Sequence, residues 1–168
     1  RSTGEVMGVA ETFGEAYLKA QLGAGERMPA TGKVFIAVRD EDKHLIVQTV
    51  KNFLSLGYGV CATRGTAAYL AEQGIVVQTV NKVREGRPHI VDAIKNGEIA
   101  LVVNTVDSNP QTIADSHSIR RSALTQRVPQ YTTIAGGEAM SEGVKSLNDI
   151  HVFSIQELHQ RLAAQKIS

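Results

Sequence analysis

The sequence predicts a doubly wound α/β domain, with a five-stranded, mostly parallel sheet and helices on both faces. From residue 33 onward, apolar runs of strand length alternate with segments of helical spacing. The apolar runs are continuous, which is typical of parallel strands that are buried on both faces. Gly57, Gly74 and Gly97 each follow a predicted helix, where glycine commonly ends one.

The predicted strands share this apolar character and cover residues 34–38, 58–62, 75–80, 99–104 and 130–134. The predicted helices between them cover residues 43–56, 66–73, 88–96 and 112–127. A further helix opens at Gly136-Gly137 and runs to about residue 145. Ser154 and Glu157 have the spacing of a capping box, which predicts a separate last helix.

Residues 1–32 are predicted to precede the main domain, which then covers residues 33–168. Apolar side chains at helical spacing predict a helix over residues 11–22, and a segment with glycines and a proline then forms a linker. The sequence begins with Arg1 in place of methionine, and we expect it to be a piece of a longer polypeptide.

Composition and missing motifs narrow the function classes. Lys and Arg total 18 against 17 Asp and Glu, so no excess of positive charge favours nucleic-acid binding. No apolar stretch approaches the roughly 20 residues of a membrane helix, and a cytoplasmic protein is expected. The single cysteine, Cys61, lies in a predicted strand and is interpreted as a core thiol. The five histidines show no metal-ligand spacing, and neither a Walker loop nor a dinucleotide fingerprint is present.

Polar residues gather where the predicted strands end, which is the edge at which open α/β sheets bind ligands. These residues are Lys43, Thr63, Gly65, Thr66, Lys82 and Asn104. Lysines, threonine hydroxyls and free amides at a helix N-terminus bind anions, and a glycine lets the backbone approach them. An amide such as that of Asn104 can bind a sugar hydroxyl. The set predicts a pocket for a phosphorylated sugar or a nucleoside monophosphate.

Each residue also has a structural interpretation. Lys43 could be the solvated start of a helix, and Lys82 a charge on a loop. Thr63 and Thr66 could serve as turn and helix N-cap residues. The residues alone therefore predict an anion site and no particular ligand.

Several segments resemble a known family, at residues 1–8, 62–66, 80–89, 94–97, 104–105, 119–124 and 132–133. The most specific is Asn-Lys-Val-Arg-Glu-Gly-Arg-Pro-His at residues 81–89. Together they resemble the C-terminal regulatory domains of carbamoyl phosphate synthetase large subunits, which have the methylglyoxal-synthase-like fold. The first residues are similar to the end of the ATP-grasp domain that precedes this domain in the family.

The resemblance implies an allosteric domain that binds UMP or IMP and contributes to an ornithine site, regulating ATP-dependent carbamoyl phosphate synthesis for pyrimidines and arginine. By position, the effector phosphate would meet Lys43, Thr63, Gly65, Thr66 and Lys82. Asn104 would approach the ribose, Val83 and Ile119 the base, and Thr132 the ornithine.

The resemblance also implies that this piece is itself non-catalytic and needs no cofactor. Its parent would be a glutamine-hydrolysing ligase that uses ATP with Mg or Mn. Implied partners are the rest of the large subunit and the glutaminase small subunit, and a homo-oligomer is possible.

Two segments depart from the family pattern. One extra residue follows Asn104-Thr105, where the family often has a threonine and a glycine, and Tyr131 is shifted by one position. The rival function is methylglyoxal synthase, which needs a carboxylate base besides a phosphate pocket. Asp40 and Asp107 are the candidates for that base, but the Gly-Gly-Asp-Gln-Gln stretch of that enzyme is absent.

Overall fold

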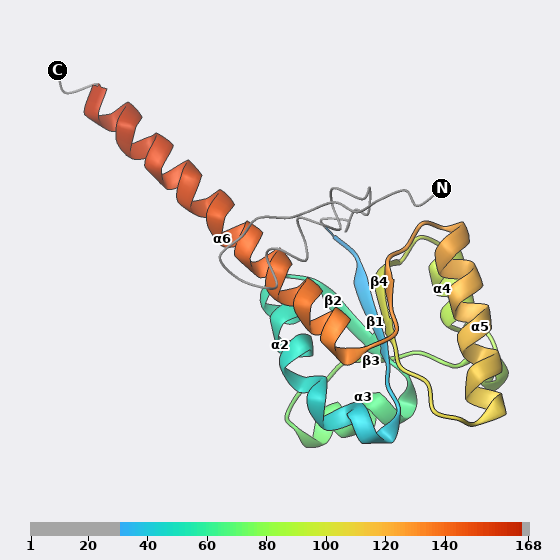
Figure 1. The fold of residues 1–168 in the computed structure, drawn as a ribbon. Helices are drawn as coiled ribbons and strands as arrows, with labels where there is room; N and C mark the ends of the chain where they lie inside the picture. The colour runs from blue at the N-terminus through green and yellow to red at the C-terminus, as the bar shows by residue number, and fades with distance from the viewer. Residues whose placement is uncertain (1–30, 166–168) are drawn as a thin grey trace, which may run out of the picture.

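The computed structural model describes residues 31–165 and contains one five-stranded sheet in this range (Figure 1). The strands are β1 (Lys33–Ala37), β2 (Gly59–Ala62), β3 (Gln78–Thr79), β4 (Ile99–Asn104) and β5 (Gln130–Tyr131). Their order is β3-β2-β1-β4-β5, and every neighbouring pair is parallel. The predicted α/β fold with five strands is confirmed, and the sheet is wholly parallel where the sequence predicted a mostly parallel one.

The helices cover both faces of the sheet. They are the 3₁₀ segments η1 (Asp40–Leu45) and η2 (Val83–Glu85) and the helices α2 (Val47–Ser55), α3 (Arg64–Glu72), α4 (Ile90–Lys95), α5 (Pro110–Thr125) and α6 (Ile134–Gln165). In Figure 1, α2, α3 and α6 lie on one side of the sheet, and α4 and α5 lie on the other. Within the described residues, no helix is long and apolar enough to cross a membrane.

Side chains of β1 alternate between two apolar layers. Ile36 points into the layer that contains Phe53 of α2 and Met140 of α6. Phe35 belongs to the opposite layer, with Ile94 of α4. All of these side chains are fully buried, so β1 is the centre of the core. This arrangement explains why the apolar runs in the sequence are continuous.

The first turn of α6 lies close to the sheet because two glycines leave room. A Cβ atom on Gly137 would lie 3.0 Å from Cγ2 of Val103, and one on Gly136 would lie 3.0 Å from Cδ1 of Tyr131. Gly136 also donates its N–H to Oγ1 of Thr133. The two glycines therefore allow α6 to pack closely against β4 and β5.

We expect Gly137→Val to lower the free energy of unfolding by about 1–3 kcal/mol, since it forces extra carbons against a buried strand. Gly59→Val is the matched control, because its Cβ would meet only the flexible Lys33 side chain, at 3.2 Å from Cγ. Urea denaturation of both variants checks the prediction, and equal losses would contradict it.

Several predicted boundaries were wrong on the β2 side of the sheet. The predicted helix over residues 43–56 is divided into η1 and α2. The next helix begins at Arg64 instead of residue 66, because the backbone of Thr63 is already extended and forms the N-cap. The predicted strand over residues 75–80 shortens to β3, whose residues are exposed and pair with β2 alone.

Boundaries in the second half also differ. Helix α4 begins at Ile90, and His89 is its N-cap, accepting a hydrogen bond from the N–H of Asp92. Helix α5 begins at Pro110 because Asn109 accepts the N–H of Gln111 at 2.9 Å. Strand β5 stops at Tyr131 because α6 follows almost at once.

The predicted separate last helix was wrong, because α6 continues unbroken through Ser154. Residues 146–153 contain neither glycine nor proline, so nothing in the sequence ends the helix before the expected cap. The predicted helix over residues 11–22 lies outside the described residues. The boundary at residue 33 stays a prediction.

Candidate functional site

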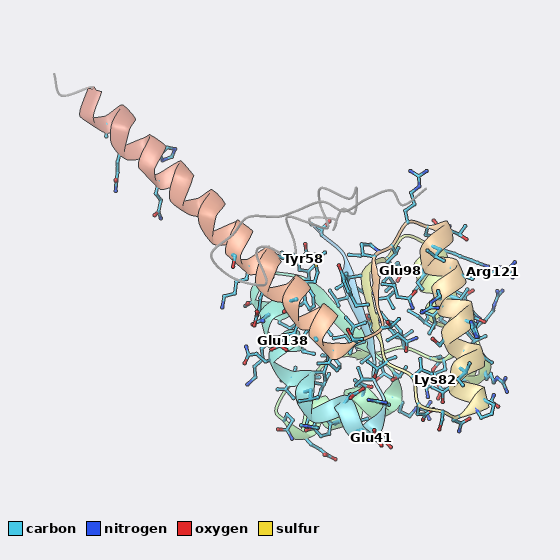
Figure 2. All side chains as sticks on the ribbon, in the orientation of Figure 1. Glu41, Tyr58, Lys82, Glu98, Arg121 and Glu138 are labelled. Atoms are coloured by element: carbon cyan, nitrogen blue, oxygen red, sulfur yellow. The ribbon has the colours of Figure 1, made fainter. Side chains whose placement is uncertain are left out.

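A cavity of about 230 Å³ opens at the carboxyl end of the sheet. Strand β1 lies between β2 and β4. The chain therefore adds β2 and β3 on one side of β1 and then adds β4 and β5 on the other side. Ligands of open α/β sheets bind at such a point. In Figure 2, Glu41 and Lys82 lie toward this end of the sheet, and Tyr58 and Glu98 lie toward the opposite end. The topology therefore places the cavity where the sequence predicted a ligand.

The cavity brings together all the residues that the sequence assigned to a nucleotide. They are Lys43, Thr63, Gly65, Thr66, Lys82, Val83, Asn104 and Ile119. Thr132 does not line this cavity and lies exposed between β5 and α6. Residues as far apart as 43 and 119 thus share one site, and the predicted ornithine residue lies outside it.

The N-terminus of α3 forms one wall of the cavity. The first helical hydrogen bond runs from the N–H of Ala67 to the carbonyl of Thr63, at 2.8 Å. The amides of residues 64–66 therefore have no partner within the helix. These donors and the helix dipole favour an anion at this wall.

Lys43 reaches this helix start because Gly65 has no side chain. A Cβ on Gly65 would lie 3.3 Å from Nζ of Lys43. The Lys43 side chain is only 18% exposed, and its Nζ lies 2.6 Å from Oδ1 of Asp40. The hydrogen bond from Lys43 lowers the pKa of Asp40 below its usual value. Lys43 is therefore part of the cavity wall. It is not simply a solvated residue at the start of a helix.

The two threonines of this wall are buried and bonded to one another. Thr63 and Thr66 share a hydrogen bond between their Oγ1 atoms at 3.2 Å, and Thr66 Oγ1 accepts the N–H of Val38 at 3.3 Å. Thr63 is the N-cap by position, but its side chain makes no capping bond. The hydroxyl of Thr66 thus ties the end of β1 to α3.

A network that the sequence did not predict links the segments that follow β1 and β4, and its residues Arg39 and Thr105 line the cavity. The N–H of Arg39 donates to Oγ1 of Thr105 at 3.0 Å, and Nε of Arg39 donates to Oδ2 of Asp42 at 2.7 Å. The hydrogen bond from Arg39 lowers the pKa of the Asp42 carboxyl. Asp42 and Lys43 are both in η1, so this network anchors the segment that carries the lysine.

The cavity wall also combines apolar side chains with further polar ones. Apolar contacts come from Phe35, Val83, Ile90 and Ile119. Asn104 donates Nδ2 to Oγ of Ser116 at 3.1 Å, and Asp115 lies 3.7 Å from Nε of Arg84. Apolar surface beside an amide, a hydroxyl and a carboxylate suits a flat, hydroxylated ligand.

Helix α5 contributes cavity residues that the sequence reasoning missed. These residues are Thr112, Asp115 and Ser116. Together with Ile119 they have spacings of three and four residues, which places them on one face of a helix. That periodicity could have identified the face, but only the strand order shows that it faces the cavity.

Both candidate bases for the rival enzyme line the cavity. Asp107 accepts the N–H of Asn109 at 2.9 Å. Asp40 is bound to Lys43, and its lowered pKa makes it a weaker base than an ordinary carboxylate. Within residues 31–165, no three His, Cys, Asp or Glu side chains group as metal ligands.

Cys61 is fully buried in β2, as the interpretation of a core thiol requires. Burial raises the pKa of the thiol to about 11. We expect iodoacetamide to alkylate Cys61 at pH 8 only in denaturant, since the thiolate is the reactive form. Mass spectrometry with and without urea checks this, and rapid labelling of the folded chain would contradict it.

Comparison with known proteins places the chain in a family. Residues 45–132 match the family model of the MGS-like domain. The chain is 71% identical over 162 residues to the carbamoyl phosphate synthase large chain of Neisseria meningitidis serogroup A. It is 60% identical over 162 residues to that of Pasteurella multocida and 50% identical over 164 residues to that of Pseudomonas syringae pv. tomato.

These alignments cover 96–98% of this chain and 15% of each relative. The alignment with the crystal structure of ForH covers 77% of this chain and 97% of the ForH chain, at 18% identity and a TM-score of 0.44. The family assignment therefore rests on the sequence comparisons. The resemblance found in the sequence is confirmed: the chain belongs to the MGS-like domain family, in the form found in carbamoyl phosphate synthase large chains.

Proposed function

We propose that this chain is the effector-binding domain of a carbamoyl phosphate synthase large subunit and that its cavity binds a nucleoside monophosphate, UMP or IMP. The observation that supports this most strongly is the combination of groups that line one cavity. Two lysines and a helix N-terminus lie in its wall together with apolar side chains and Asn104. A phosphate, a ribose and a base require that combination.

In the proposed complex, the phosphate accepts hydrogen bonds from the amides of residues 64–66 and from Lys43 and Lys82. Thr63 adds its hydroxyl, and Asn104 binds the ribose. The base packs between Val83 and Ile119. All the side chains named in this pose line the cavity.

Regulation follows if the nucleotide binds two states of the parent subunit with different affinity. The parent is proposed to make carbamoyl phosphate for pyrimidine and arginine synthesis, using ATP with Mg or Mn, in the cytoplasm. Its proposed partners are the rest of the large subunit, a glutaminase small subunit and further copies of itself. Thr132, which lies outside the cavity, is proposed to contact ornithine where this domain meets its neighbour.

Calorimetric titration of the chain with UMP and with IMP tests the proposal. We expect one molecule of at least one nucleotide to bind per chain, and Thr132→Ala to leave that affinity unchanged. Absence of binding by both nucleotides would contradict the proposal.

The same protein should not convert dihydroxyacetone phosphate to methylglyoxal. The assay is informative because Asp107, a candidate base for this reaction, lines the cavity. Turnover that disappears in Asp107→Ala would replace the regulatory proposal by a catalytic one.

A further inference from the structure

We propose that Asp40 is a specificity-determining residue of this site: an internal anion that holds Lys43 when no ligand is bound and that the ligand's phosphate replaces. This inference rests on the proposed function and concerns how the site responds to the charge of the phosphate.

The first support is that the side chains of Lys43 and Asp40 differ greatly in solvent exposure. Asp40 and Lys43 lie three residues apart in η1, with Oδ1 and Nζ separated by 2.6 Å. The lysine side chain is 18% exposed, whereas that of Asp40 is 92% exposed. The ammonium group therefore lies within the cavity wall, and the carboxylate has room to turn toward water.

The second support is the location of the ion pair. Nζ of Lys43 lies beside Gly65, within the first turn of α3. An anion bound to the amides of this turn needs the same ammonium group that Asp40 now contacts. Two negative groups cannot share it without repulsion, so binding of a phosphate displaces the carboxylate.

The third support is the charge balance around the phosphate position. Arg39 is paired with Asp42, and Arg84 with Asp115. Among the described residues, no ion pair involves Lys82, although its charge also acts on Asp40. The remaining charged residues of the cavity, Lys43, Lys82, Asp40 and Asp107, have a net charge of zero, which is too little for a phosphate dianion.

A measurable consequence follows from Coulomb's law. The repulsion between Asp40 and the phosphate grows with the charge on the phosphate. Removal of the carboxylate charge should therefore strengthen binding of a dianion more than binding of a monoanion.

The test compares the full chain with Asp40→Asn by calorimetry with UMP and IMP at pH 8 and at pH 5. The second phosphate pKa is about 6, so the ligand is mostly dianionic at the higher pH and monoanionic at the lower. We expect Asp40→Asn to tighten binding by about 10-fold at pH 8 and by about 3-fold at pH 5.

Glu41→Gln is the matched control. Glu41 is the next acidic residue, is 83% exposed and lies 3.9 Å from Arg39 instead of Lys43. Its replacement should change the affinity less than about 2-fold at either pH, within the range of weak surface pairs. Each variant is compared with the parent chain at the same pH.

A second measurement follows Asp40 itself. Its carboxyl pKa, measured by NMR, should rise when UMP or IMP saturates the site, because the phosphate takes Lys43 and adds negative charge nearby. An unchanged pKa would show that the ion pair persists in the complex and would overturn the inference.

Unchanged or weaker binding by Asp40→Asn would mean that the carboxylate positions Lys43 for the ligand, and it would overturn the inference. Equal tightening at both pH values would mean that the charge of the phosphate has no effect on the gain, and it would overturn the inference as well. Either result would leave the proposed function intact. If neither nucleotide binds the parent chain or the variant, the proposed function and this inference both fail.

Discussion

The double variant Lys43→Ala/Lys82→Ala is expected to bind UMP or IMP at least about 100-fold more weakly than the parent chain. Each lysine would make a charge-assisted contact, whose loss costs about 1.5–3 kcal/mol, and about 1.4 kcal/mol corresponds to 10-fold in affinity. Both side chains line the cavity, and neither belongs to the apolar core. The loss should therefore appear in binding and leave folding almost unchanged.

Lys51→Ala is the control, because Lys51 is an exposed lysine of α2 that does not line the cavity. Its affinity for the nucleotide should equal that of the parent chain. A double variant that stayed within about 3-fold of the parent, which is less than 1 kcal/mol, would mean that the phosphate lies elsewhere.

Phe53→Ala is expected to lower the free energy of unfolding by about 3–5 kcal/mol, the usual cost of removing a buried aromatic side chain. Phe53 is fully buried between α2 and the sheet, and its ring meets that of Tyr58 edge to face at a centroid distance of 6.1 Å. The cavity left behind would lie in the middle of the larger apolar layer.

Leu54→Ala is the matched control for this experiment, since Leu54 is the next residue of α2 and is 41% exposed. Its loss should be below about 1 kcal/mol. Urea denaturation, followed by circular dichroism, compares the two variants. Similar losses would contradict the assignment of Phe53 to the core.

Several residues that line the cavity could be predicted from the sequence because they directly follow strands. Thr63 and Asn104 lie at the ends of β2 and β4, and parallel strands bring such ends to one edge. Gly65 could be identified for the same reason, although its clearance for Lys43 depends on a neighbouring segment.

The remaining cavity residues were only partly predictable. Val83 and Ile119 were assigned through the resemblance alone, and Asp115 and Ser116 were missed. Asp115, Ser116 and Ile119 reach the cavity because β4 lies beside β1 and α5 covers that half of the sheet. Alternation of strands and helices predicts the layers, but strand order depends on long-range packing that no local pattern contains.

Errors in element boundaries have local causes. Helix α3 begins early because Thr63 is extended, and β3 is short because only one of its edges is paired. Helix α6 is longer than predicted because a capping-box spacing permits a helix start without requiring one.

The proposed function depends most directly on where the phosphate of a nucleoside monophosphate binds. Amide chemical shifts of the ¹⁵N-labelled chain, recorded during titration with UMP and with IMP, give that position. We expect the largest changes at residues 64–66 and at Lys82 and Val83. Changes confined to the region around Thr132, or no changes with either nucleotide, would contradict the proposed function.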